Sequence, residues 1–132
     1  KKELLEGKHD FTASTGSAFK LAMYNSNAVL GKSTTSYTTG SEVTSPAGYT
    51  AGGKALVNTG TSVATSVAIT TFGNLSFTNV TLTARGALIY NTSDADSAVA
   101  VLDFVDNKTA TAGTFTIQFP AYTTSAAILR IS

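Results

Sequence analysis

The sequence predicts an all-β fold, a jelly-roll-like β-sandwich of about eight antiparallel strands with little helix. Short stretches such as residues 115–119 alternate apolar side chains with Thr, Ser or Gln, and this period of two places the apolar groups on one face of a strand. Turn-forming residues recur about every 8 to 15 residues, as in sandwiches. No stretch repeats its apolar residues with the 3.6-residue period of a helix.

Residues 1–10 are the only charge-dense part of the chain, and we expect them to form an extended N-terminal arm, with one helical turn over residues 2–6 as the alternative. Residues 11–132 are long enough to bury one core and are expected to form a single β-sandwich domain. Within it, residues 9–13 predict a short strand that is followed by a turn. Residues 19–24 predict a longer strand. One face of this strand carries large apolar side chains: Phe19, Leu21 and Met23.

The middle of the chain contains a polar stretch, residues 31–48, that predicts a long irregular connection. A connection of this length usually has a function or is covered by a partner. The pair Gly52-Gly53 lies in a strand-like run, which indicates a bulge or a close backbone approach. Residues 63–69 alternate without interruption and predict one continuous strand.

In the C-terminal half, the apolar phase reverses at residues 78–79, which predicts a bulge or a turn. Residues 86–90 are nearly all apolar, as expected of a central strand, and residues 98–104 predict a second buried strand after a turn. A further turn is expected at residues 105–108. The remaining elements are a strand centred on Ile117 that ends at Pro120, and a last strand over residues 127–131.

Composition excludes several classes of function. The 132 residues contain no cysteine, which rules out thiol catalysis, disulfide frameworks and cysteine-ligated metal sites. Charged residues make up 13 % of the chain and the formal net charge is +1; since basic residues are mostly scattered, we expect no nucleic-acid partner. The apolar runs are too short for a membrane span of about 20 residues, and acids occupy the place of a signal-peptide core. We expect no membrane partner.

Residues that carry chemistry are few. His9 is the only imidazole, and its neighbour Asp10 would point to the opposite face of a strand, so we expect an unengaged surface histidine near a mobile terminus. Asp94 and Asp96, with Asn91, offer oxygens either to calcium or to an Asx-rich turn. We predict no enzyme activity, no metal and no cofactor.

Three tyrosines lie in or beside the expected loops: Tyr37, Tyr49 and Tyr122. Exposed rings of this kind stack on sugars in carbohydrate-binding surfaces. The alternative is that they pack the ends of loops onto the sandwich.

Five blocks of sequence, taken in order, resemble a family of small virion proteins encoded by tailed bacteriophages. They are FKLAMY (19–24), GYTAGGKAL (48–56), ARGALIYN (84–91), AVAVLDF (98–104) and GTFTIQFP (113–120), with Tyr37 of a Thr-rich loop and the pair Glu42-Val43 between the first two. The resemblance covers most of the chain and includes no catalytic motif.

The resemblance implies a structural role, and we favour a capsid decoration (cement) protein on the outer surface of the virion. Such a protein would bind the phage major capsid protein and copies of itself, as a homotrimer. The alternative is a tail, adaptor or fibre component that binds a receptor or a glycan. The expected partner contacts are four arm residues and two loop tyrosines: Lys1, Lys2, Glu3, Lys8, Tyr37 and Tyr49.

Overall fold

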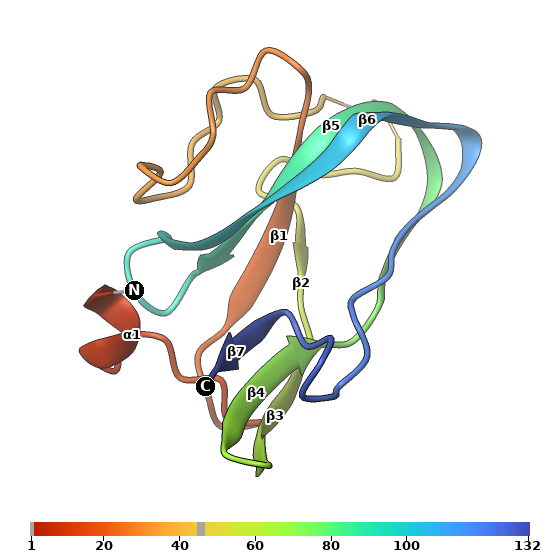
Figure 1. The fold of residues 1–132 in the computed structure, drawn as a ribbon. Coiled ribbons are helices and arrows are strands. Elements are labelled where there is room, and N and C mark those ends of the chain that lie inside the picture. Colours follow the sequence, from red (N-terminus) through yellow and green to blue (C-terminus); the bar gives the residue numbers. More distant parts are fainter. Residues whose placement is uncertain (1, 45–46) are drawn as a thin grey trace.

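The computed structural model describes residues 2–44 and 47–132, and in this part of the chain the regular structure is almost all strand, with long irregular connections between some strands (Figure 1). A four-residue helix, α1 (Lys2–Leu5), opens the chain. The strands are β1 (Phe19–Tyr24), β2 (Lys54–Ala55), β3 (Asn58–Ala64), β4 (Val67–Phe72), β5 (Leu75–Asn91), β6 (Ser97–Ile117) and β7 (Leu129–Ile131). The all-β prediction is confirmed, whereas residues 9–13 form no strand.

The strands form two antiparallel sheets. The first has the order β2-β1-β5-β6 and the second the order β3-β4-β7. Strands β6 and β7 each pair on one side only, so both are edge strands. Connectivity of the jelly-roll type, by contrast, stays a prediction.

The central strand β1 forms where the sequence predicts it and is buried on both faces. Its predicted apolar face joins the main core through Phe19, Leu21 and Met23. The opposite face carries Ala22 and Tyr24, which pack with side chains of β5 in a second cluster. The main core covers the first face of β1, and side chains of the long connection cover the second face.

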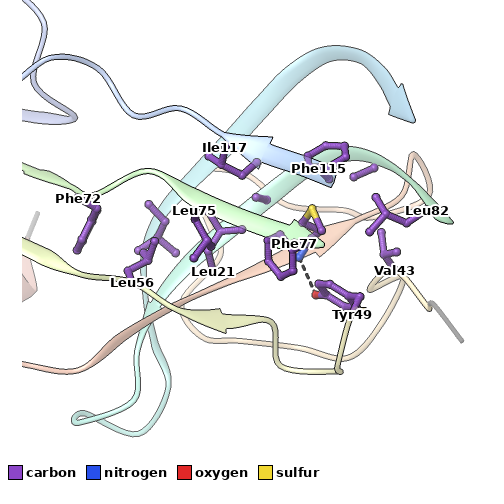
Figure 2. Packing of buried hydrophobic residues seen from close by; sticks show 14 of the residues in the cluster. Leu21, Val43, Tyr49, Leu56, Phe72, Leu75, Phe77, Leu82, Phe115 and Ile117 are labelled. Atoms are coloured by element: carbon purple, nitrogen blue, oxygen red, sulfur yellow. Dashed lines mark hydrogen bonds between the residues drawn. The ribbon is translucent and has the colours of Figure 1, made fainter. Parts of the chain in front are cut away.

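The main core lies under β1 and the first half of β5 (Figure 2). Phe72 packs edge-on against Phe19, with ring centroids 5.4 Å apart. Phe77 lies 5.4 Å from the ring of Tyr49. Aromatic pairs in this geometry add about 0.5–1.5 kcal/mol each to simple burial.

Bulges explain why the protein has fewer and longer strands than expected. The register between β5 and β6 shifts between Phe77 and Val80, and Asn79 adopts a left-handed φ of 55°, as the reversal of apolar phase predicts. The turn expected at residues 105–108 is wrong. Val105 instead adopts a φ of 68° inside β6, and the strand continues to Ile117.

The prediction of one continuous strand over residues 63–69 is also wrong. Thr65 and Ser66 both have positive φ values, 50° and 63°, and they form the tight turn of the β3–β4 hairpin. Two consecutive residues with positive φ define a type I′ turn, which matches the twist of the flanking strands. Neither residue is the Gly, Asn or Asp that normally marks such a turn.

Gly53 makes the close backbone approach that the sequence predicts. Its φ is 69°, and a Cβ at this position would overlap the carbonyl group of Leu21. The approach brings the chain into register for β2, which pairs Lys54 with Leu21.

Residues 25–44 and 47–53 contain no named strand, and the part up to Tyr37 runs over the second face of the first sheet, whereas Val43 and Tyr49 reach the main core. The described part contacts that face through Ala28, Leu30 and Tyr37, which pack against Tyr24, Leu88 and Tyr90. Backbone hydrogen bonds join it to β1, from Val43 N to Met23 O (2.8 Å), and to the β5–β6 turn, from Tyr37 N to Asp96 O (2.9 Å). The expected long irregular connection is therefore present, and it is packed onto the sheet.

Candidate functional site

Glu42 is the centre of the most extensive polar network in the described chain. Its side chain is buried, and its Oε1 accepts hydrogen bonds from the Tyr49 hydroxyl (2.6 Å) and the Gly52 N–H (2.8 Å). Its Oε2 accepts from the Tyr37 hydroxyl (2.6 Å). All three partners donate, which is the arrangement that an ionised carboxylate requires.

Two further tyrosines complete what we call the Glu42 cluster: Glu42, Tyr24, Tyr37, Tyr49 and Tyr90. Tyr24 donates to Thr38 O (2.5 Å) and Tyr90 donates to Gly52 O (2.6 Å). The rings of Tyr37 and Tyr90 stack with centroids 4.7 Å apart. The tyrosines of β1 and β5 thus bond to backbone carbonyl groups of the connection, whereas the two tyrosines of the connection bond to Glu42.

Tyr49 joins this cluster to the main core. Its hydroxyl accepts a hydrogen bond from the Met23 N–H (2.9 Å), as Figure 2 shows, so its own proton is available to Glu42. No buried side-chain nitrogen or oxygen in the described residues lacks a hydrogen-bond partner. Both carboxylate oxygens of Glu42 are therefore bonded within the molecule.

The environment of the cluster disfavours ionised tyrosine. Burial, the largest cause, and the nearby Glu42 charge raise the pKa of Tyr24 to about 12. Burial and the charges of Asp96 and Glu42 likewise raise the pKa of Tyr90 to about 12. Burial and the hydrogen bond to Glu42 raise the pKa values of Tyr37 and Tyr49 further still. All four phenols therefore stay protonated donors at neutral pH.

The structure brings together the two loop tyrosines proposed as partner contacts. Tyr49 is buried and Tyr37 is partly buried, and both rings pack inside the molecule. This is the arrangement in which tyrosines pack a loop onto a sheet. Tyr122 keeps 39 % of its surface exposed. Sequence reasoning quoted Glu42 within the resemblance but gave it no role; its further signal is that it is a lone acid in a charge-poor connection between two tyrosines.

Three of the predicted arm residues line one cleft of about 680 Å³. Lys2, Glu3 and Lys8 face it from the arm, and the opposite wall is formed by residues 30–35 and by the start of β6. Lys1 lies outside the described residues. The N-terminal arm is a short helix and a turn, not the extended segment that we expected.

His9 fixes the arm to the body of the protein, which corrects the expectation of an unengaged surface histidine. The residue is 8 % exposed. Asn91 Nδ2 donates to Lys8 O (2.9 Å) and lies 3.1 Å from His9 Nδ1, so Nδ1 is the acceptor and Nε2 carries the proton. That Nε2 lies 3.5 Å from a carboxylate oxygen of Glu3.

The acidic turn after β5 is built from local hydrogen bonds. Asn91 Oδ1 accepts from Ser93 N (2.9 Å), and the Ser97 hydroxyl contacts a carboxylate oxygen of Asp94 (2.9 Å). These are Asx-type contacts. Among residues 2–44 and 47–132, no three His, Cys, Asp or Glu side chains are grouped so as to hold a metal ion.

Each sheet has two edge strands, β2 and β6 in the first and β3 and β7 in the second. Residues 35–37 cover only the start of β6, where Ala98 N donates to Thr35 O (2.9 Å). Beyond it, residues 99–102 are uncharged and half-buried, whereas residues 103–113 carry charges and two left-handed positions that discourage strand pairing. The edge strand β7 borders an apolar groove of about 430 Å³.

Comparison of the chain with models of protein families, with curated proteins and with solved structures finds no match. The described part of the chain also contains no helix with the length and apolar character needed to cross a membrane. The site must therefore be interpreted from its own geometry.

Proposed function

We propose that the protein is a structural component of a virus particle, a capsid decoration protein that binds the head shell of a tailed phage. The observation that carries the proposal is an all-β body in which the β6 edge includes an uncharged, half-buried stretch, residues 99–102, and the β7 edge borders an apolar groove. Edges of this kind are usually covered in the working state of a protein.

The partners in this proposal are the major capsid protein and further copies of the chain, as a homotrimer on the capsid surface. The resemblance of the five sequence blocks to small virion proteins supports the choice of particle. The Glu42 cluster supports a structural role, because its polar atoms bond to one another and fix residues 25–53 in place.

Receptor or glycan binding by a tail or fibre component is the competing function, and it has less support. A sugar platform needs exposed rings, but Tyr37 and Tyr49 are packed and bonded internally. The arrangement leaves Tyr122 as the candidate ring of the three.

The experiment is a binding assay with DNA-free heads assembled from tailed-phage major capsid proteins. We expect the protein to cosediment with such heads and to raise the temperature at which they come apart. A glycan array run in parallel tests the competing function. Binding to glycans without binding to any head would overturn the proposal, and so would turnover of a substrate.

A further inference from the structure

We infer that the apolar groove beside β7 is the surface through which copies of this chain bind one another, and that the element which enters it is helix α1 of the neighbouring copy. The inference rests on the proposed function, since it names the surface by which an assembly subunit would meet its own kind.

The groove lies between α1 and the second sheet, and its walls are mainly apolar. The described residues that line it are Leu4, Leu5, Phe11, Thr61, Ala68, Ile69, Thr70, Leu129, Arg130 and Ile131. Its volume of about 430 Å³ accommodates two or three large side chains rather than a whole domain.

Large apolar side chains at the rim of the groove are unusually exposed. Leu5 is 91 % exposed and Ile131 is 63 % exposed. Ile131 lies on β7, whose outer edge is unpaired. Exposed apolar groups that gather around a groove mark an interaction surface, whereas scattered ones need no explanation.

Charge identifies the occupant. Of the described residues that line the groove, only Arg130 is charged. Its guanidinium donates to Thr124 O (3.0 Å), and no carboxylate in residues 2–44 or 47–132 lies within ion-pair distance of it. A fitting partner therefore brings apolar side chains and one negative charge.

Helix α1 of a second copy meets both requirements. Leu5 projects into solvent and is followed directly by Glu6. Glu6 contacts Lys2 (3.4 Å) and Lys8 (3.9 Å), but these pairs are solvent-exposed and hold it weakly. Because α1 borders the groove of its own copy, two copies that meet here contact each other's α1 in turn, so this interface has a twofold axis and is separate from the contacts that would close a homotrimer.

Sedimentation velocity over a range of protein concentrations tests the inference. We expect the wild-type chain to form species heavier than its 13.5 kDa monomer. Leu5→Asp and Ile131→Lys should each raise the dissociation constant by at least about tenfold, as expected for an interface anchor. Val29→Asp is the matched control, because Val29 is 99 % exposed and does not line the groove.

A charge exchange tests the predicted contact directly. Arg130→Glu alone and Glu6→Lys alone should each weaken association, because like charges then meet across the interface. An equimolar mixture of the two variants should associate again, since lysine at position 6 of one copy then faces glutamate at position 130 of the other. Circular dichroism of each variant establishes that it is folded.

The inference is overturned if the wild-type chain sediments as a monomer at every concentration, or if the groove variants associate as tightly as Val29→Asp. Binding of a fatty acid to a monomeric protein, lost in Arg130→Glu, would also overturn it by assigning the groove to an amphiphile. A monomer that binds phage heads refutes this inference and leaves the proposed function standing. Association through the groove without head binding does the reverse.

Discussion

Replacing Glu42 by Ala removes the acceptor of three hydrogen bonds and should destabilise the protein by about 2–4 kcal/mol. A buried donor left without an acceptor costs about 1–3 kcal/mol. The hydroxyl of Tyr49 and the N–H of Gly52 lose their acceptor in a buried or half-buried place, whereas Tyr37 is exposed enough for its hydroxyl to turn to water. Loss of the cost of burying a carboxylate offsets part of this penalty.

Glu42→Gln provides the matched control. The amide keeps the shape of the side chain, and its oxygen still accepts from Tyr49 and Gly52, which both bond to Oε1 in the wild type. The amide nitrogen then faces Tyr37, whose hydroxyl accepts as well as donates. We therefore expect a cost of about 1 kcal/mol, the difference between a charge-assisted and a neutral network.

Urea unfolding followed by circular dichroism measures both variants, with m-values close to that of the wild type. Hydrogen exchange should locate the effect, with faster exchange in residues 25–53 and unchanged exchange in β4. A cost below about 0.5 kcal/mol for Glu42→Ala, the range of ordinary surface substitutions, would refute the view that this carboxylate holds the connection. If Glu42→Ala and Glu42→Gln lowered the free energy of unfolding equally, the charge of Glu42 rather than its shape would hold the connection.

Three further predictions concern the backbone and pH. Val105→Asn should stabilise the protein by about 1 kcal/mol in urea unfolding, because a β-branched residue is strained at a φ of 68° and this side chain is 72 % exposed; an unchanged midpoint contradicts this. Gly53→Ala should abolish folding by circular dichroism, since its Cβ would overlap a backbone carbonyl, whereas Gly31→Ala has open space and should leave folding unchanged. Tyrosine ionises at about pH 10 in the unfolded chain, whereas Tyr24 and Tyr90 ionise at about pH 12 in the folded protein. Between these two pH values the unfolded state binds fewer protons, so the stability of the protein should fall as the pH rises. Thermal melts that do not change over this window contradict the shifted pKa values.

Local pattern was sufficient for the parts of the fold that obey local rules. The strand Phe19–Tyr24 follows from its alternation, and the irregularity at Asn79 follows from the reversal of apolar phase on either side of it. In both cases the order of apolar and polar neighbours determines which side chains share a face, and only one arrangement buries the apolar ones.

Pattern failed where the backbone adopts a conformation that its side chains do not announce. Thr65 and Ser66 turn the chain with positive φ values although neither has the usual preference for them. Val105 passes through the left-handed region within a strand, held by the hydrogen bond from its N–H to Asp103 Oδ1 (2.8 Å). Pairing of β3 with β4 sets the first two positions and pairing of β5 with β6 sets the third, and single-residue propensity is overridden.

The candidate site was half predictable for a related reason. Tyr37 and Tyr49 draw attention as aromatic residues in a polar connection, but their common partner is decided only by folding. The Tyr49 hydroxyl reaches Glu42 because Met23 N–H fixes its position from β1, and no sequence spacing encodes that contact.

The Glu42 cluster and the groove beside β7 share no residue. The polar groups of the cluster bond to one another and to the backbone, and they hold the described part of the long connection on the body of the protein. The groove holds an unpaired arginine and exposed aliphatic side chains at an open edge. The polar groups of the Glu42 cluster therefore stabilise the monomer, whereas Arg130 and the exposed aliphatic side chains lie together at α1 and β7. An assembling subunit needs such groups at its contact surface.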